Sequence, residues 1–341
     1  MKALFLSAPR SFQYLDVPSP AAAPGELRVR MKYVGICGSD IHYYTEGRIG
    51  DQVVHYPFVL GHEGSGEVAS DAGPLRKGMP VYIEPAMPCH RCDQCLAGRE
   101  NTCRNLKFLG NPLESAGCMS EEIVLPQECI VPVPDWMGLD EAVLLEPLCI
   151  GVYAVKRSRA EMSCRAAIVG AGPIGLSVLL ALTDFEPRCV FVSEPVEARR
   201  SAALQLGANG SFDPGPAGAA PAVFDAAEGG ADVVFECAGT QEAIDDALHM
   251  LRPGGTLVLI GIPEGRDRIT YDPHLARRRE VTVVNIRRQN RCIEQAISIL
   301  KRRRDAPRVL ITHRFPPAKA KEAFDIIENK ADCAIKALLQ F

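Results

Sequence analysis

The chain has 341 residues, of which 47% are hydrophobic and 23% are charged, and its formal net charge is −4. This length is more than one hydrophobic core usually supports, so we expect two domains. The weak acidic charge offers no strong field for nucleic acid or for an anionic membrane, and we expect neither as a partner. The 13 cysteines are a high and odd number, which argues against a disulfide framework and favours reduced thiols, some of them bound to metal.

The first part of the chain, up to about residue 146, predicts an irregular domain rich in β-strands. Its start, MKALFLSAPRSF, is too poor in apolar residues for a secretory signal. The sequence also has no apolar run of the roughly 18 residues that a membrane helix needs, so we expect a soluble, cytoplasmic protein. Residues 25–34, GELRVRMKYV, alternate apolar with polar residues as a half-buried strand does, and glycine and proline interrupt the following stretch every few positions.

Two glycine-bordered segments of this domain carry candidate metal ligands. Cys37 lies in GICGSD and His62 in LGHEG, and a thiolate with an imidazole suits zinc. Glu63 and Glu146 are carboxylates in apolar surroundings, where a charge without a partner is costly. Adjacent side chains of a straight strand face apart, but the glycines on both sides of the pair at 62–63 allow a bend toward one ion. Taken singly, each residue is typical of a satisfied buried polar group, so this interpretation depends on the nucleotide-binding fold that follows.

Residues 89–103, CHRCDQCLAGRENTC, contain cysteines with the spacing C-x2-C-x2-C-x7-C. Tight turns let the first three thiolates converge on one cation, and the fourth closes a tetrahedron that leaves no position for substrate. A ferredoxin-type iron–sulfur run has its fourth cysteine after about three residues and then a proline, whereas here seven residues intervene and Arg104 follows. We therefore predict a structural zinc site, rather than an iron–sulfur cluster or unrelated thiols, at Cys89, Cys92, Cys95 and Cys103.

After Glu146 strand-like and helix-like segments alternate, from AAIVG and GPIGLSVLLAL to QEAIDDALHML and GGTLVLIGI. Strands rich in Val and Ile, separated by segments of helix length, predict an α/β fold with a doubly wound parallel sheet. The tail contains the strand-like VLITHRF, the helix-like PAKAKEAFDIIENK and the apolar CAIKALLQF, which we expect to return to the first domain. We therefore assign residues 1–147 and 287–341 to a β-rich domain, with a zinc lobe at about 86–105, and residues 148–286 to a nucleotide-binding domain.

The segment AAIVGAGPIGLSVLLAL places Gly170, Gly172 and Gly175 as G-x-G-x-x-G between a strand and a helix. The first glycine permits the tight turn, the second lets backbone approach a pyrophosphate, and the third lets helix pack on strand. The helix N-terminus favours negative charge. Glu194, 19 residues beyond Gly175, ends the next strand, where a carboxylate accepts hydrogen bonds from ribose hydroxyls. It repels a 2′-phosphate, so NAD is favoured over NADP, although two nearby arginines weaken this preference.

Taken together, these motifs resemble the zinc-dependent medium-chain dehydrogenases, most closely the sorbitol (polyol) dehydrogenase branch. The resemblance extends over essentially the whole chain, and the motifs occur in the family's order. It implies a GroES-like β-rich catalytic domain formed by both ends of the chain, with a Rossmann NAD-binding domain inserted between them. The matching segments are GICGSDIHYY, GHEGSGEV, the four-cysteine lobe, EPLCIGVYA, GAGPIG, FECAG and THRFP.

The resemblance also implies a catalytic zinc and a reaction. In the alcohol dehydrogenase branch the third zinc-binding residue is a cysteine at the position of Glu146, whereas polyol dehydrogenases use the glutamate after the histidine. By this likeness Cys37, His62 and Glu63 bind the catalytic zinc with one water. Glu146 then hydrogen-bonds that water or exchanges with Glu63. A substrate hydroxyl on zinc loses its proton and its carbon gives hydride to NAD, which yields a ketone.

Further residues are carried over from the family by position. Ser39 and His42 match positions that pass the proton through ribose hydroxyls to solvent. Polyol dehydrogenases commonly have Arg-Tyr where this chain has Arg287-Arg288, so the arginine pair could bind hydroxyls, a sugar-acid carboxylate or the cofactor. The implied cofactor residues are Gly170, Gly172, Pro173, Ile174, Gly175, Glu194, Arg199, Cys237 and Arg287. The implied substrate residues are Tyr43, Phe108, Glu146, Arg287 and Arg288.

These features predict an NAD-dependent dehydrogenase with two zinc ions per chain that oxidises a secondary hydroxyl of a polyol such as sorbitol or xylitol. The alternatives within the family are an L-threonine 3-dehydrogenase, a sugar-acid (aldonate) dehydrogenase and a simple alcohol dehydrogenase; THRFP and Glu146 favour the polyol. A non-catalytic NAD-binding redox sensor is an alternative of another class. It predicts no open metal position, whereas Cys37, Ser39 and His62 favour one. The family also implies a homo-tetramer or dimer.

Overall fold

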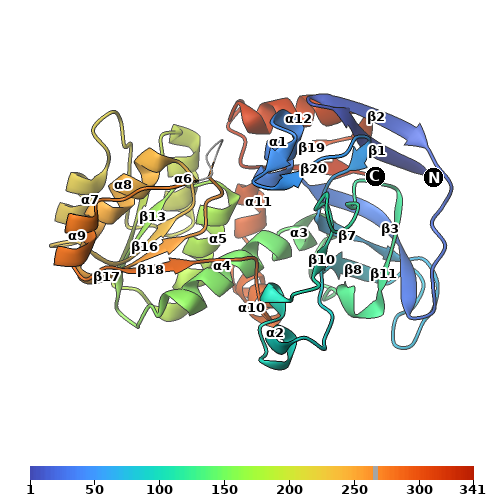
Figure 1. The fold of residues 1–341 in the computed structure, drawn as a ribbon, viewed down its shortest axis with the longest axis horizontal. Coiled ribbons are helices and arrows are strands. Elements are labelled where there is room, and N and C mark those ends of the chain that lie inside the picture. Colours follow the sequence, from blue (N-terminus) through green and yellow to red (C-terminus); the bar gives the residue numbers. More distant parts are fainter. Residues whose placement is uncertain (264–267) are drawn as a thin grey trace. The chain divides into compact units, whose positions relative to one another are not determined.

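The computed structural model describes residues 1–263 and 268–341. The chain folds into two compact units (Figure 1). Unit 1 contains Met1–Glu146 and Ile311–Phe341, and unit 2 contains Pro147–Leu310. The chain thus leaves unit 1 once and returns to it near its end.

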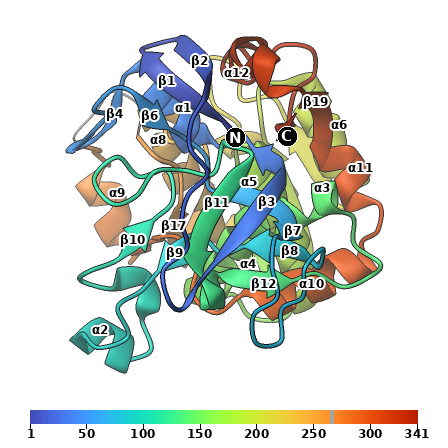
Figure 2. The ribbon, with the colours of Figure 1, turned by 90° about the vertical axis from the view of Figure 1, so that its right-hand side faces the viewer.

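Unit 1 is built around a sheet with the strand order β12-β8-β7-β3-β20-β19, and β11 also pairs with β3. Figure 2 shows β11, β3, β7 and β8 of this sheet. The neighbouring strands are antiparallel except for β19 and β20. The alternating residues 25–34 form most of β3, in the interior of this sheet. The strands are β3 (Glu26–Gly35), β7 (Glu63–Val68), β8 (Pro80–Ile83), β11 (Glu122–Pro126), β12 (Ile130–Pro132), β19 (Ile311–Phe315) and β20 (Lys336–Gln340).

A second sheet of unit 1 has the order β2-β1-β6, and two short strand pairs, β4-β5 and β9-β10, lie outside both sheets. The rings of Phe12, Tyr44 and Phe324 pack with centroids 4.7 to 5.4 Å apart, so β2, α1 and α12 share one core. The strands are β1 (Lys2–Ala8), β2 (Ser11–Asp16), β4 (Arg48–Ile49), β5 (Gln52–Val53), β6 (Phe58–Val59), β9 (Ala86–Met87) and β10 (Lys107–Phe108). The α-helices are α1 (Gly38–Thr45), α2 (Asp93–Leu96), α3 (Leu139–Ala142) and α12 (Ala320–Glu328), with 3-10 turns at 100–102, 127–129 and 317–319.

Unit 2 has a parallel sheet with the order β15-β14-β13-β16-β17-β18, and helices cover both of its faces (Figure 1). The order reverses at β13, as in a doubly wound Rossmann fold, so the expected α/β fold is confirmed. The strands are β13 (Arg165–Val169), β14 (Cys189–Ser193), β15 (Gly210–Phe212), β16 (Ala231–Glu236), β17 (Leu251–Leu259) and β18 (Thr282–Asn285). The helices are α4 (Leu145–Ser158), α5 (Pro173–Leu182), α6 (Glu197–Gln205), α7 (Ala220–Ala226), α8 (Gln241–Met250), α9 (Pro273–Arg278), α10 (Ile293–Arg302) and α11 (Ala306–Leu310), with a 3-10 turn at 183–185.

The unit boundaries differ in part from those expected. The first boundary, 146/147, lies one residue from the expected 147/148, whereas the chain returns to unit 1 at 310/311 instead of 286/287. The difference arises because α10 packs on α5 and α11 packs on α6, which keeps both helices in unit 2. Arg287 and Arg288 consequently belong to unit 2.

Helix α5 is apolar along its length and is almost completely buried, because it packs on β13 and β16 and is covered by α10. It has 10 residues, about half of what a bilayer requires. Within residues 1–263 and 268–341, no helix has both the length and the apolar character that crossing a membrane demands.

Candidate functional site

Three side chains of unit 1 bring metal-ligand atoms together. The Cys37 thiol, a His62 ring nitrogen and a Glu63 carboxylate oxygen all lie within 4.8 Å of one another. Cys37 is the N-cap of α1, while His62 and Glu63 lie at the start of β7. The bend that turns both neighbours to one side is at Gly61, whose φ of +94° suits glycine. Gly64 lies within β7 and contributes no bend, contrary to the expectation for it.

Asp40, which the sequence analysis did not identify, connects the two segments. Its carboxylate is fully buried and accepts hydrogen bonds from the N–H groups of Cys37, at 3.0 Å, and Gly61, at 3.1 Å. Asp40 Oδ1 also lies 3.8 Å from His62 Nδ1. This distance is longer than a hydrogen bond, but it places the imidazole Nδ1 beside the Asp40 carboxylate, and the other ring nitrogen is then available to a metal. An acid at the third helical position, as in a capping box, was the signal in the sequence.

Lys336 of β20 is the second residue that the sequence analysis missed. Its Nζ donates hydrogen bonds to both carboxylate oxygens of Glu63, at 2.8 and 2.6 Å, and to the carbonyl of Ile36, at 3.1 Å. Burial is the largest single influence on the pKa of Lys336 and lowers it, but the nearby negative groups, above all Glu63 through its charge and its hydrogen bonds, together outweigh burial and raise it. Lys336 therefore remains an ammonium. The signal was a single charge within the apolar segment CAIKALLQF, because a buried lysine requires a partner.

Apart from the Glu63–Lys336 ion pair, burial makes this region unfavourable for anions when no metal ion is bound. Burial and the carboxylate of Glu63 raise the pKa of the Cys37 thiol to about 12. Glu146, in the first turn of α4, is 4% exposed, and burial raises its pKa to about 8. A divalent cation would favour the charged forms of both groups. Among the described residues, the three-ligand group that contains Cys37 does not include Glu146.

Ser39 and His42, the expected proton-relay residues, both lie on α1. The Ser39 side chain hydrogen-bonds the Cys37 thiol, which places it beside the candidate ligands. His42 Nδ1 lies 3.6 Å from Glu46 Oε1, one helical turn further on, and its side chain is 14% exposed. The helix thus extends from Cys37, beside the metal-ligand group, to a histidine that reaches solvent.

Tyr43 and Phe108, the expected substrate residues of unit 1, have different surroundings. The Phe108 ring lies 5.3 Å from the His62 ring, so it forms one wall of the metal-ligand group. Tyr43 is buried and its hydroxyl donates to Gln52 Oε1 at 3.0 Å. Phe108 therefore contacts the candidate site directly, whereas the described contact of the Tyr43 hydroxyl is with the loop around β5.

The four cysteines form a second group of ligand atoms. The Sγ atoms of Cys89, Cys92, Cys95 and Cys103 lie within 4.8 Å of one another. Cys92 Sγ is 3.6 Å from Cys95 Sγ and 3.8 Å from Cys103 Sγ. The edge of a tetrahedron with zinc–sulfur bonds of about 2.3 Å is about 3.8 Å. Hydrogen bonds, chiefly from the Arg91 N–H, lower the pKa of the Cys89 thiol to about 6, so it is ionised at neutral pH.

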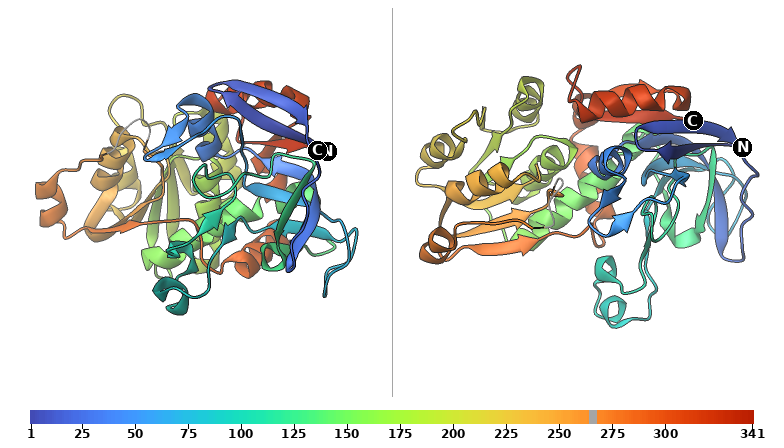
Figure 3. Two further views of the ribbon diagram at one scale, coloured as in Figure 1. Left: turned by 45° about the vertical axis from the view of Figure 1, so that its right-hand side comes forward. Right: turned by 45° about the horizontal axis from the view of Figure 1, so that its top comes forward.

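The lobe that carries these cysteines projects from the sheets of unit 1, with α2 at its tip (Figure 3). The thiols themselves accept hydrogen bonds from the lobe's backbone: Cys103 Sγ accepts from the N–H groups of Cys89, at 3.3 Å, and Asn105, at 3.4 Å. The core of the lobe consists of Cys95, Cys103 and Leu106. Because so few apolar residues support it, we attribute its order to the four converging thiols.

The glycine motif forms the turn between β13 and α5. Gly170 has a φ of +94°, and a Cβ on Gly175 would overlap the Gly170 carbonyl. Gly172 is the N-cap of α5, and Pro173 and Ile174 begin its first turn. The nearest heavy atom to a Cβ at Gly172 would be Arg199 Nη1, at 3.9 Å. The turn is therefore tight at Gly175 and has free space at Gly172, as a pyrophosphate at the helix N-terminus requires.

The remaining cofactor candidates also lie near the carboxyl edge of the parallel sheet. Glu194 follows β14 and is buried; its Oε2 accepts from the Ala171 N–H at 2.7 Å and its Oε1 from the Val196 N–H at 2.9 Å. The carboxylate thus holds the glycine turn and keeps further lone pairs for a ribose. Cys237 follows β16, and its N–H donates to the Val169 carbonyl at 2.8 Å. Arg287 and Arg288 follow β18 at the same edge, with Arg288 at a φ of 55°.

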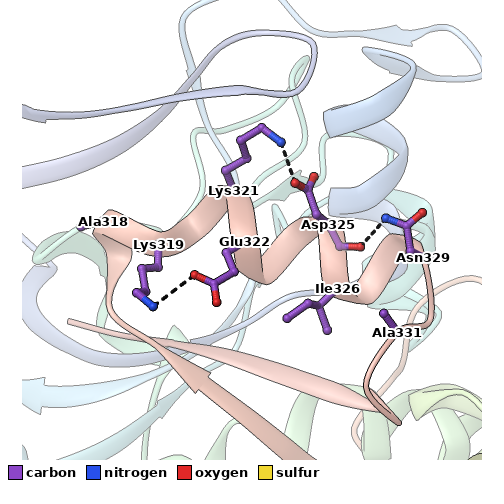
Figure 4. Close-up of a pocket in the computed structure, with 8 residues that line it drawn as sticks. All are labelled: Ala318, Lys319, Lys321, Glu322, Asp325, Ile326, Asn329 and Ala331. Atoms are coloured by element: carbon purple, nitrogen blue, oxygen red, sulfur yellow. Dashed lines mark hydrogen bonds and ion pairs between the residues drawn. The ribbon is translucent and has the colours of Figure 1, made fainter.

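A surface hollow of about 550 Å³ lies along α12 and contains none of the expected site residues (Figure 4). Its charged side chains pair with one another, Lys319 with Glu322 at 3.2 Å and Lys321 with Asp325 at 2.6 Å. The hollow therefore offers no unpaired charge from these four residues, and we assign it no role.

The chain combines a Rossmann sheet with a β-rich unit, and the β-rich unit contains two groups of side chains suited to bind zinc. This combination defines the class of zinc-binding dehydrogenases. Comparison with family models agrees. Residues 23–135 match the alcohol dehydrogenase GroES-like domain, and residues 173–302 match the zinc-binding dehydrogenase model. The chain therefore belongs to the zinc-dependent medium-chain dehydrogenase/reductase family, a family of oxidoreductases, and the resemblance noted from its motifs is confirmed.

Characterised relatives cover nearly the whole chain. It is 31% identical over 338 residues to a sorbitol dehydrogenase of Bacillus subtilis, which covers 98% of this chain and 95% of that protein. It is 33% identical to an L-idonate 5-dehydrogenase of Vitis vinifera, over 90% of this chain and 86% of that protein. An alcohol dehydrogenase of Escherichia coli CFT073, solved with NADH, has a TM-score of 0.89 at 25% identity and covers 100% of this chain and 99% of its own.

Proposed function

We propose that this chain is an NAD- and zinc-dependent dehydrogenase that oxidises a secondary hydroxyl of a polyol, such as sorbitol or xylitol, to a ketone. The convergence of Cys37, His62 and Glu63 carries the proposal, because three protein ligands leave one position of a tetrahedral ion for a substrate hydroxyl. Glu146 stands where the alcohol dehydrogenase branch has a cysteine, which favours the polyol branch. The relatives named sorbitol dehydrogenase support the same substrate class.

The chemistry of each ligand set fits a zinc ion. One thiolate, one imidazole and one carboxylate suit a catalytic ion, while four thiolates form a closed structural site. We assign Cys37, His62 and Glu63 to the catalytic zinc ion, and the four cysteines of the lobe to the structural zinc ion. The chain would thus hold two zinc ions.

The turn at 170–175 and Glu194 fit NAD. Space at Gly172 and the N-terminus of α5 suit a pyrophosphate. A carboxylate at the end of β14 accepts hydrogen bonds from ribose hydroxyls and repels a 2′-phosphate. Arg199 approaches Gly172, where its guanidinium can contact the pyrophosphate. Cys237 and Arg287 complete the proposed cofactor residues.

Bound zinc would lower the pKa of the substrate hydroxyl, and bound NAD would accept the hydride. The side chains of the protein position these groups and carry the proton. The Asp40 carboxylate lies beside the His62 ring, and Ser39 hydrogen-bonds Cys37. Glu146, whose pKa is about 8 when no cation is bound, is suited to hold a proton near the ligands. Ser39 and His42 are the proposed route by which the proton reaches solvent.

A sugar-acid dehydrogenase is the second candidate. The arginine pair Arg287-Arg288, where polyol dehydrogenases commonly have Arg-Tyr, would bind a carboxylate well. The relative named L-idonate 5-dehydrogenase supports this alternative. A redox sensor with purely structural zinc is disfavoured, because the three-ligand group is not closed by a fourth cysteine as the lobe is. A homo-tetramer or dimer remains an expectation from the family, and size-exclusion chromatography with light scattering would test it.

A substrate screen tests the proposal. Purified protein with bound metal is mixed with NAD and sorbitol, xylitol, L-idonate, L-threonine or ethanol, and NADH absorbance is followed. We expect turnover with a polyol, and its loss in Cys37→Ala, which should keep one zinc per chain. Cys189→Ala, in unit 2, is the matched control and should keep both zinc ions and activity. Turnover of the sugar acid alone would favour the second candidate, and a single zinc in the unmodified protein would contradict the catalytic site.

A further inference from the structure

We infer that Lys336 is a positioning residue that restricts Glu63 to binding the metal through one carboxylate oxygen. This inference rests on the proposed role of Glu63 as a ligand and deepens it. It concerns how many positions around the metal remain open to the substrate, which the identity of the ligands alone does not decide.

The contacts of Lys336 hold its ammonium group in one place. Two hydrogen bonds reach Glu63 Oε1 and Oε2, at 2.8 and 2.6 Å, and one reaches the Ile36 carbonyl, at 3.1 Å. An ammonium has three N–H donors, so these contacts use all of them. The side chains of Lys336 and Glu63 are 1% and 0% exposed, so solvent screens the pair very little.

Gly35 provides the space for this ion pair. In the sheet, Gly35 of β3 is paired with Glu63 of β7 on one side and with Leu338 of β20 on the other. A Cβ at Gly35 would overlap Glu63 Oε2. The Glu63 carboxylate therefore lies over the glycine and reaches across β3 to the first residue of β20. Three adjacent strands build the contact, which makes it a feature of the sheet rather than of a flexible surface.

The position of the ammonium decides how Glu63 can bind a metal. A nitrogen that is close to both carboxylate oxygens occupies the side on which their lone pairs converge. A metal that is chelated by both oxygens requires that same side. With Lys336 in place, the metal can therefore bind one oxygen, through its other lone pair. The ammonium also offsets part of the negative charge of Glu63, which leaves the metal a stronger Lewis acid toward a substrate oxygen.

Cobalt substitution makes the coordination number visible. Co²⁺ replaces zinc in the unmodified protein and in Lys336→Met, and the visible absorption bands are compared. Loss of the ammonium lets Glu63 chelate with both oxygens, so we expect five-coordinate Co²⁺ with weaker bands and unchanged metal content. For the zinc form, we expect kcat to fall about 10- to 100-fold with little change in KM. Lys336→Arg retains the charge and should restore both spectrum and kcat.

Lys321→Met is the matched control, because Lys321 is an exposed lysine on α12 that pairs with Asp325. It should change neither the cobalt spectrum nor kcat. An unchanged spectrum in Lys336→Met would overturn the inference and leave Lys336 a purely structural cation.

A second measurement decides the question if Lys336→Met does not fold. In a crystal structure of the zinc-loaded unmodified protein, one Glu63 oxygen should bind the metal while Lys336 Nζ keeps its hydrogen bonds. Both oxygens on the metal, or neither, would contradict the inference. Failure of the proposed function is separate, because an unmodified protein that oxidises no polyol still gives the spectral comparison and the crystal structure, and these decide the role of Lys336.

Discussion

Asp40 Oδ1 lies 3.8 Å from His62 Nδ1 and accepts a hydrogen bond from the Gly61 N–H, just before the histidine. Its other oxygen accepts from the Cys37 N–H. One buried carboxylate therefore sets the spacing of two candidate metal ligands that are 25 residues apart in the chain.

Asp40→Asn should destabilise the protein and impair the metal centre. An amide has one acceptor oxygen, so one of the two backbone N–H groups loses its partner, at a cost of about 1–3 kcal/mol. We expect kcat to fall about 10- to 100-fold as the imidazole loses its orientation. Thermal unfolding and turnover measure the two effects. Asp71→Asn is the control, because Asp71 is exposed and accepts the Lys77 N–H at 2.7 Å.

Glu63→Gln and Glu146→Gln should differ in metal content. Glu63 belongs to the three-ligand group and Glu146 does not. We expect one zinc per chain in Glu63→Gln, and two zinc ions with reduced kcat in Glu146→Gln. Metal analysis by mass spectrometry, after exhaustive dialysis, distinguishes the variants. The opposite result would make Glu146 the direct ligand.

Zinc affinity at the Cys37 site should rise with pH. In the metal-free protein the pKa of the Cys37 thiol is about 12, so at pH 6 to 8 the thiol is protonated and zinc must displace that proton. Each unit of pH should then strengthen binding about tenfold per proton released. Competition with a chromophoric chelator at pH 6, 7 and 8 measures how zinc affinity changes with pH. The zinc bound by Cys37→Ala under the same conditions is subtracted, which removes the contribution of the four-cysteine lobe. A flat profile would show that the thiol is already ionised.

Glu194→Ala should shift the cofactor preference toward NADP. The substitution removes the carboxylate that repels a 2′-phosphate and leaves Arg199 and Arg200 nearby. We expect the ratio of kcat/KM for NAD to that for NADP to fall by about two orders of magnitude, as the loss of a charged hydrogen bond implies. Glu197, an exposed acid in the first turn of α6, is the control, and Glu197→Gln should leave the ratio unchanged. An unaltered ratio in Glu194→Ala would remove Glu194 from the ribose site.

Alanine at Gly172 and at Gly175 should have different effects. A Cβ at Gly175 overlaps the Gly170 carbonyl, so Gly175→Ala should cost about 1–3 kcal/mol of stability or more. Gly172 has a φ of −70° and no heavy atom closer than Arg199 Nη1 at 3.9 Å, so Gly172→Ala should fold normally. Its methyl group would nevertheless occupy the space of the pyrophosphate and weaken NADH binding. Thermal unfolding and NADH fluorescence titration separate the two outcomes.

Local patterns predicted much of the fold. The strand, glycine turn and helix at 165–182 could be recognised because each step, from the apolar strand RAAIV to Gly175, is encoded within a few neighbouring residues. The return of the chain to unit 1 was placed too early. Helix α10 is amphipathic, and an apolar face indicates that a helix packs on something but does not indicate on which unit.

Contacts distant in sequence account for the missed site residues. The pair Cys37 and His62 was predicted because each has a recognisable local motif. Lys336 could not be assigned to Glu63, because 273 residues separate them and the pairing depends on the order of β7, β3 and β20. Asp40 was overlooked because its bond to Gly61 also spans two segments.

The late position of β20 has a consequence for synthesis on the ribosome. Unit 2 is continuous in sequence, so all of it is made before β19 and β20 can join the sheet of unit 1. At roughly 5–20 residues per second, the 273 residues added after Glu63, up to and including Lys336, take on the order of 10–50 s to translate. During that interval the end of β3 that pairs with β20, residues 33–35, lacks its partner strand and Glu63 lacks its counter-ion. The surroundings of the candidate metal-ligand group are therefore among the last parts of the protein to be completed, and the growing chain exposes a strand end that chaperones can protect.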